Sequence, residues 1–88
     1  MGSYSLTFKP SVEKDLERIS HETVTRVMKR IQGLALDPLP PQAIKLSGSE
    51  RLYRIRVGDY RVVYEVDARA RLVVIHYVRH RRDVYRRI

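Results

Sequence analysis

The sequence predicts an α+β fold in which a helical hairpin packs on a twisted antiparallel sheet, with the element order β-α-α-β-β-β. One short alternating strand comes first, two segments with apolar residues at helical spacing follow, and three strand-like runs separated by turn residues come last. The chain has 88 residues, of which 43% are hydrophobic, and this is enough for one core. We therefore expect one domain spanning residues 1–88, with a short basic C-terminal helix or tail.

The first strand and both helices are expected in the N-terminal part of the chain. Apolar residues alternate with polar ones at Tyr4, Leu6 and Phe8, which predicts a half-buried strand. Pro10 ends this strand, and Ser11 is expected to cap the first helix. The apolar stripe of that helix consists of Val12, Leu16 and Ile19. A second helix is expected after a cap at Ser20, with an apolar stripe of Val24, Val27, Met28, Ile31 and Leu34.

The remaining strands are expected in the C-terminal part. A proline-rich connector at 37–41 ends the second helix, and residues 43–46 then form a short strand or edge segment. A hairpin is predicted over 51–57 and 60–66. Residues 72–78 are almost continuously apolar, which indicates an internal strand covered on both faces.

The predicted hairpin gathers positive charge on one face. Gly58-Asp59 is a two-residue turn signal, and glycine in its first position favours a type II′ turn. Such a loop sets Arg56 directly across from Arg61, and Arg54 shares the face of Arg56 because it lies two residues away. Like charges directly opposite each other destabilise a sheet, so this face predicts an anionic partner. The alternative is a solvated face with splayed side chains.

The charge of the chain is concentrated in its C-terminal part. Residues 1–50 have a net charge of +1, whereas residues 51–88 have a net charge of +7 with eleven arginines and no lysine. Guanidinium groups offer forked donors that match phosphate, whereas lysine would serve equally well for solubility alone. This composition favours a nucleic acid as the partner, with an acidic protein segment as the second choice.

Several kinds of site are excluded by what the chain lacks. It has no cysteine, no phosphate-binding glycine loop and no dinucleotide fingerprint, and its three histidines are too scattered for a metal site. We expect no cofactor and no metal, and we expect His76 to be structural. The sequence has neither a membrane-spanning apolar run nor a signal peptide, so a soluble cytoplasmic protein without a membrane partner is expected.

Residues 80–85 place an imidazole, two guanidiniums and a phenol close together. Guanidiniums suit the stabilisation of charge on a pentavalent phosphorus, but they stay protonated and therefore make poor bases. RNA cleavage without a metal would leave proton transfer to Tyr85 or His80 and would rely strongly on substrate positioning. The alternative for Tyr85 is to cover the edge of the core.

Three segments of the chain resemble a known family: residues 45–48 (KLSG), 53–66 (YRIRVGDYRVVYEV) and 80–85 (HRRDVY). They are similar to the RelE branch of the RelE/ParE toxin superfamily, and the similarity covers almost the whole chain. It implies a bacterial or archaeal type II toxin that enters the ribosomal A site and cleaves the mRNA codon there. The products would carry a 2′,3′-cyclic phosphate and a 5′-hydroxyl.

The resemblance also implies roles for individual residues. The basic strand positions of the family fall on Arg54 and Arg56, and Arg61 and Arg81 would grip the scissile phosphate. Tyr85 would stack on a base or orient the nucleophile.

Further RNA contacts are expected from Lys45, His80 and Arg82, and His80 stands where some relatives have lysine. The implied partners are the ribosome, mRNA and a cognate antitoxin whose acidic or amphipathic segment wraps the basic surface. Operator DNA would be reached only through that antitoxin.

Two departures from the family pattern affect proton transfer. Arginine replaces lysine at positions 54 and 56, which removes a lysine base, and Arg79 replaces a glycine common before the tail. Two alternative functions remain: a ParE-like inhibitor of DNA gyrase, and a nucleic-acid-binding relative without catalysis.

Overall fold

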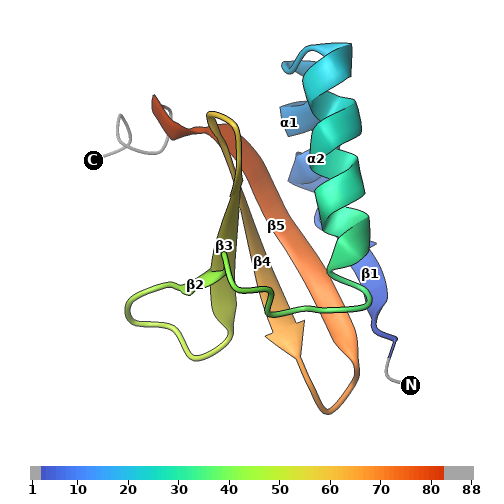
Figure 1. Cartoon of the computed structure of the whole chain (residues 1–88), viewed down its shortest axis with the longest axis vertical. Coiled ribbons are helices and arrows are strands. Elements are labelled where there is room, and N and C mark those ends of the chain that lie inside the picture. Colours follow the sequence, from blue (N-terminus) through green and yellow to red (C-terminus); the bar gives the residue numbers. More distant parts are fainter. Residues whose placement is uncertain (1–2, 83–88) are drawn as a thin grey trace.

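A five-stranded sheet with two helices on one of its faces makes up the structure. The computed structural model describes residues 3–82 of the chain. In chain order the elements are β1 (Ser5–Phe8), α1 (Pro10–Glu17), α2 (His21–Gly33), β2 (Ile44–Lys45), β3 (Leu52–Val57), β4 (Tyr60–Asp67) and β5 (Leu72–His80). Both helices lie on the same side of the sheet, and no helix of the described residues covers the other side (Figure 1). The predicted fold class is confirmed.

The strands are ordered β1-β5-β4-β3-β2. The β3–β4 hairpin is antiparallel with Val57 opposite Tyr60, as its two-residue turn predicted, and the β2–β3 and β4–β5 pairs are also antiparallel. The structure differs from the expected antiparallel sheet at β1, which lies parallel to β5 from Ser5↔Leu72 to Phe8↔Ile75. This placement makes β5 an internal strand, as its apolar run predicted.

The two helices begin in different ways. At α2 the prediction is confirmed, because the Ser20 side chain accepts a hydrogen bond from the Thr23 N–H at 3.3 Å. At α1 the predicted cap is wrong: Lys9 is the N-cap and Pro10 occupies the first turn. Proline suits that position because its fixed φ is helical and its missing N–H would be unbonded there. Ser11 instead donates from Oγ to the His76 carbonyl at 3.4 Å.

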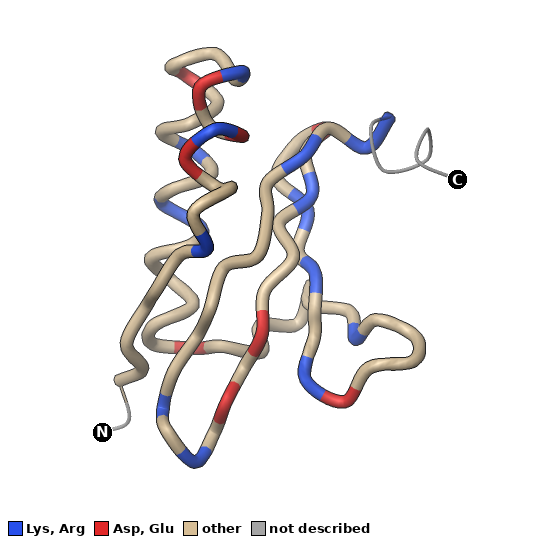
Figure 2. The backbone as a smooth tube through the Cα atoms, turned by 180° about the vertical axis from the view of Figure 1, so that it is seen from behind, with Lys and Arg blue, Asp and Glu red and all other residues tan. Residues whose placement is uncertain are grey.

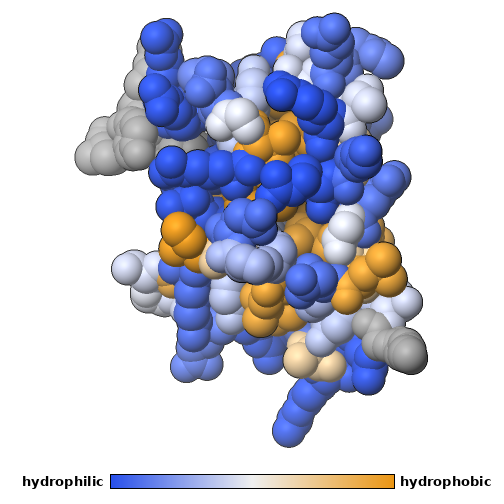
Figure 3. All heavy atoms as spheres, in the orientation of Figure 1, coloured by the Kyte–Doolittle hydropathy of each residue, from blue (hydrophilic) through white to orange (hydrophobic). Residues whose placement is uncertain are grey.

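The core lies between the helices and the sheet, and Figure 3 shows hydrophobic residues in this gap with hydrophilic residues around them. Its buried members are Val12, Val27, Ile31, Leu34, Ile55, Val57, Val62, Tyr64, Val73, Ile75 and Val78. Phe8 is more exposed than its alternating pattern predicted, at 42%, because it ends an edge strand.

Tyr64 is the largest fully buried side chain, and its hydroxyl donates to the Pro38 carbonyl at 2.8 Å. This bond ties the connector after α2 to the middle of the sheet. Burial, with smaller contributions from Tyr53 and Asp37, raises the pKa of the Tyr64 phenol to about 12. Tyr64 therefore acts as a neutral structural donor under ordinary conditions.

Candidate functional site

A row of three arginines crosses the helix-free face of the sheet. Arg56 on β3 lies opposite Arg61 on β4, as the hairpin register predicted, and Arg61 lies opposite Arg79 on β5. We call Arg56, Arg61 and Arg79 the arginine row. Figure 2 shows basic segments gathered where the β3–β4 hairpin turns and β5 leaves the sheet.

The hairpin turn holds the first two members of this row in register. Gly58 has φ +61°, whereas Asp59 has no positive φ, and this combination matches the predicted type II′ turn. A two-residue loop fixes the pairing register of the two strands. A register shift of one residue would move every side chain to the other face of the sheet.

Arg61, the central member of the row, has an unsatisfied donor. Its Nε atom is buried and makes no hydrogen bond to any described residue. A buried donor without a partner costs about 1–3 kcal/mol. Arg61 lies beside two other guanidinium-bearing residues, so an anion bound at this row would reduce the repulsion among them.

Arg54 belongs to the next row of the same face, where it lies opposite Val63, which in turn lies opposite Tyr77. Val63 is only 2% exposed although no described helix covers this face. Val63 therefore gives this face a buried apolar position next to the arginine row.

Arg79 was not predicted as a site residue. Its place in the row depends on a register shift: Val63 pairs with Tyr77 but Tyr64 pairs with Ile75, so His76 is an extra residue on β5. The buried residues of β5 record the shift, because they change from odd positions (Val73, Ile75) to an even one (Val78). The sequence contains no signal of this shift, because residues 72–78 are almost continuously apolar and show no alternation that could change.

The start of the C-terminal tail lies beside the hairpin turn. The Arg81 N–H donates to the Asp59 carbonyl at 2.9 Å, which places the exposed Arg81 close to the arginine row. Arg82 is also exposed. Tyr85 lies outside the described residues.

Two other predicted RNA-contact residues are placed away from the arginine row. His80 lies opposite Tyr60, with the ring centroids 5.2 Å apart, and so belongs to the helix-covered side of the sheet. Its Nδ1 accepts the Arg82 N–H at 3.1 Å. Lys45 lies opposite Tyr53, which packs against the core, so its position on the edge strand also belongs to that side.

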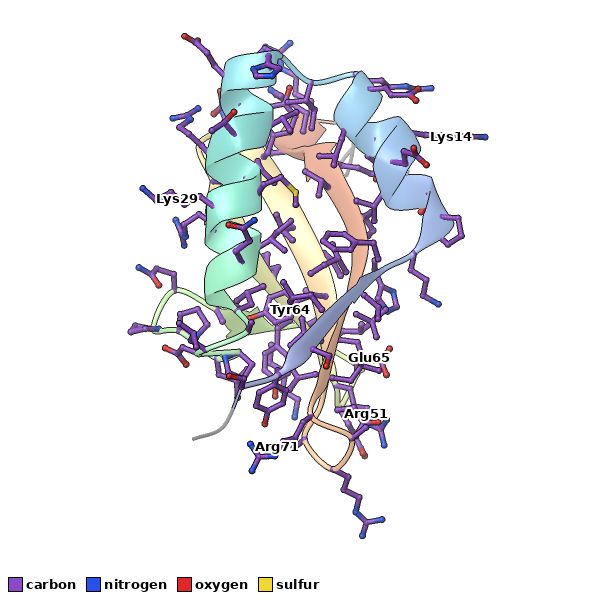
Figure 4. The ribbon with its side chains drawn as sticks, turned by 90° about the vertical axis from the view of Figure 1, so that its right-hand side faces the viewer. Lys14, Lys29, Arg51, Tyr64, Glu65 and Arg71 are labelled. Carbon is purple, nitrogen blue, oxygen red and sulfur yellow. The ribbon has the colours of Figure 1, made fainter. Side chains whose placement is uncertain are left out.

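The opposite end of the bare face carries acidic side chains that pair with basic ones. Glu65 and Asp67 on β4 form ion pairs with Arg51 at 3.7 and 3.5 Å, and Figure 4 shows Arg51 near Glu65. His76 contacts Glu65 through Nε2 at 3.2 Å, and this partner supports the prediction of a structural histidine. The face thus has a basic half and a charge-balanced half, and a polyanion is attracted to the first.

Within residues 3–82, no three histidine, aspartate or glutamate side chains form a group that could hold a metal ion. Neither described helix is long and apolar enough to cross a membrane.

The fold is that of small toxins whose structures are known in complexes with antitoxins. The family model of the ParE toxin of type II toxin–antitoxin systems matches residues 6–85, and the chain belongs to this family, within the RelE/ParE superfamily. Toxin RelG of Mycobacterium tuberculosis is 32% identical over 88 residues, covering 96% of this chain and 98% of RelG.

Solved structures agree with this assignment. The RelE–RelB complex of Pyrococcus horikoshii contains a chain that matches with a TM-score of 0.80 at 30% identity, covering 90% of this chain and 96% of that one. The RelBE2 toxin–antitoxin complex of Mycobacterium tuberculosis matches with a TM-score of 0.80 at 27% identity, covering 91% and 93%. The protein is a RelE-type toxin of a type II system.

Proposed function

We propose that this toxin is a ribosome-dependent endoribonuclease that cleaves mRNA in the ribosomal A site and so inhibits translation. The observation that supports this proposal most strongly is the arginine row, which sets three arginines side by side on neighbouring strands. A row of guanidiniums on an open sheet face fits the phosphates of a single-stranded RNA better than it fits a neutral substrate.

In the proposed reaction the 2′-hydroxyl of one nucleotide attacks its own 3′-phosphate. The new P–O2′ bond forms as the P–O5′ bond breaks, which gives a 2′,3′-cyclic phosphate and a 5′-hydroxyl. Arg61 and Arg81 would hold the phosphate and stabilise the charge on the pentavalent phosphorus, while Arg54 and Arg56 would hold the flanking chain. None of these reaction steps requires a cofactor.

Proton transfer requires a group other than these arginines, because a guanidinium remains protonated. His80 packs against Tyr60, and its Nδ1 is engaged by the Arg82 N–H, which argues against His80 as the base. We therefore assign the orienting role to Tyr85 and leave much of the rate to alignment of the RNA by the ribosome.

A cognate antitoxin is the second proposed partner. Related toxins are found in complexes with RelB antitoxins. The net charge of +7 in residues 51–88 favours an acidic or amphipathic segment lying over the same basic surface, which would exclude RNA by competition. Operator DNA would be contacted through the antitoxin, and the toxin would act in the cytoplasm, where ribosomes translate.

A second candidate function is inhibition of DNA gyrase without RNA cleavage. It is favoured by the description of the matching family, which names the ParE toxin. The arginine row continuing toward a basic tail favours the nuclease instead, because a gyrase-binding protein has no need of a phosphate-gripping centre on an open sheet face.

Primer extension on mRNA translated in a reconstituted system tests the proposal. We expect cuts within the A-site codon that appear only when ribosomes are present. A gyrase supercoiling assay run with the same protein preparation tests the alternative. If the protein abolished DNA supercoiling by gyrase and left the translated mRNA intact, the nuclease proposal would be overturned.

A further inference from the structure

Arg79 extends the arginine row onto a third strand, and the proposed reaction assigns it no task. It lies opposite Arg61 across the β4–β5 pair, on the face that bears the row. Neighbouring strands are about 4.8 Å apart, so its backbone is one strand spacing away from that of Arg61.

The guanidinium of Arg79 is held on two sides. Its central carbon lies 4.4 Å from the centroid of the Tyr77 ring, which is a close cation–π contact. Its Nε lies 3.8 Å from Asp15 Oδ1, and only 29% of the side chain is exposed. This cation is therefore ordered before any ligand arrives, which reduces the entropy cost of binding one.

Asp15 is itself fixed to the sheet. Its Oδ2 accepts the Val78 N–H at 3.1 Å. The pairing of β1 with β5 ends at Phe8, opposite Ile75, so β1 does not reach this N–H and Asp15 bonds it instead. Because that N–H is bonded to Asp15 on α1 rather than to β4, the carboxylate lies on the side of β5 away from Arg61. Asp15 thus draws the Arg79 guanidinium away from Arg61 rather than toward it.

The contact with Asp15 leaves donors for a ligand. At 3.8 Å the carboxylate attracts the Nε edge of the guanidinium but is too far away for a hydrogen bond. The terminal Nη groups form the fork that matches a phosphate. Because Asp15 draws the Arg79 guanidinium away from β4, the strand that carries Arg61, these two residues suit two phosphates better than one.

We propose that Arg79 binds the RNA phosphate adjacent to the one held at Arg61, and that Asp15 is the positioning residue that orients Arg79 for this contact. The proposal rests on the proposed function in taking RNA as the anion. It adds a second phosphate subsite, on β5. It also explains why the acidic Asp15 lies beside a surface that binds a polyanion.

Asp15 is acidic and Arg79 is basic, so substitutions can distinguish positioning of Arg79 from general electrostatic attraction of the RNA. Asp15→Asn keeps an oxygen for the Val78 N–H but makes the protein more positive, so attraction alone predicts tighter RNA binding. Positioning predicts weaker binding and slower cleavage. The matched control is Glu17→Gln, which makes the same charge change at an exposed position of the same helix.

The experiment compares wild type, Arg79→Ala, Asp15→Asn, Glu17→Gln and Arg69→Ala. Arg69 is an exposed loop residue between β4 and β5, so its removal matches the charge lost at Arg79. One measurement is the rate of ribosome-dependent mRNA cleavage. The other is affinity, across a salt series, for a short single-stranded RNA made uncleavable by a 2′-deoxy substitution at the cut site.

We expect Arg79→Ala to weaken binding of this RNA by about tenfold or more, as for the loss of a charged hydrogen bond. The slope of log affinity against log salt should flatten by about 0.7, the value for one phosphate contact on a single strand. Asp15→Asn should weaken binding and slow cleavage, whereas Glu17→Gln should leave both unchanged or slightly increased.

Equal affinities and equal salt slopes for Arg79→Ala and Arg69→Ala would overturn the Arg79 subsite. Tighter binding by Asp15→Asn, matching Glu17→Gln, would overturn the positioning role. If wild type leaves ribosomal mRNA intact but the RNA-binding differences appear, the proposed function fails while the subsite stands. Thermal unfolding of each variant checks its fold, and the Arg79→Ala arm decides the subsite if Asp15→Asn is unstable.

Discussion

Replacing Arg61 with alanine should separate the activity of this toxin from its stability. Arg61 lies directly between Arg56 and Arg79, and its buried Nε has no partner among the described residues. Removing the side chain relieves two repulsions and one unsatisfied donor. The activity should nevertheless collapse, because the same guanidinium is the proposed grip on the scissile phosphate.

The repulsion can be estimated from the row. Opposite Cβ atoms lie about 5 Å apart and long side chains can spread further, so with charge centres taken at about 7 Å each neighbour would cost about 0.6 kcal/mol in water and about 2.4 kcal/mol at an effective dielectric near 20. Screening over a Debye length of about 8 Å at physiological salt reduces both figures. The lost packing of the arginine stem opposes the gain. We expect Arg61→Ala to leave the free energy of unfolding unchanged or to raise it by about 1 kcal/mol at low salt. Any increase should become smaller as the salt concentration rises.

The effect on cleavage should be much larger. Removing one donor that stabilises developing charge typically costs about 10²–10³-fold in rate. Single-turnover cleavage of mRNA on programmed ribosomes measures this loss, and thermal unfolding at low and high salt measures the stability.

The control is Arg51→Ala, which removes an arginine from the charge-balanced end of the same face. Because Arg51 pairs with Glu65 and Asp67, its loss should lower stability slightly and leave cleavage intact. The reasoning is refuted if Arg61→Ala cleaves at the wild-type rate. It is also refuted if this variant loses stability as Arg51→Ala does, with no dependence on salt.

Three further predictions concern the tail, the salt dependence and the core. Tyr85→Phe should slow cleavage less than Tyr85→Ala if stacking dominates and equally if the hydroxyl transfers a proton; wild-type rates in both variants would remove Tyr85 from the site. Ribosome affinity, measured by co-sedimentation, should fall steeply with salt because phosphate contacts release counterions, and a flat profile would contradict a phosphate-bound toxin. The pKa of Tyr64 is raised to about 12, so the folded state keeps a proton that the unfolded chain loses above about pH 10. Denaturant titrations from pH 9 to 12 should therefore show wild-type stability falling more steeply than that of Tyr64→Phe, by up to about 1.4 kcal/mol per pH unit; parallel profiles would argue against this linkage.

The features that the sequence predicted well depend on local rules. The Gly58-Asp59 turn determines the pairing of its two strands, so the opposition of Arg56 and Arg61 followed from a two-residue loop. The cap at Ser20 was predicted for the same reason, because one side chain and one nearby N–H decide it.

The features that the sequence did not predict depend on tertiary contacts. The parallel docking of β1 requires β5, which lies more than sixty residues away, and nothing in residues 5–8 specifies that partner. Arg79 reaches the arginine face only because of the extra residue at His76; without it, the one-residue shift would turn Arg79 toward the helices. Asp15 had no visible task until α1 was placed at the edge of β5.

Cleavage of a single codon on purified, programmed ribosomes tests the account most directly, with wild type and Arg61→Ala compared with and without ribosomes. We predict that wild type cuts the A-site codon and leaves a 2′,3′-cyclic phosphate, and that Arg61→Ala is at least about a hundredfold slower. Intact mRNA with wild type, or equal rates for the two proteins, would contradict the claim that this arginine face is a phosphate-binding catalytic surface.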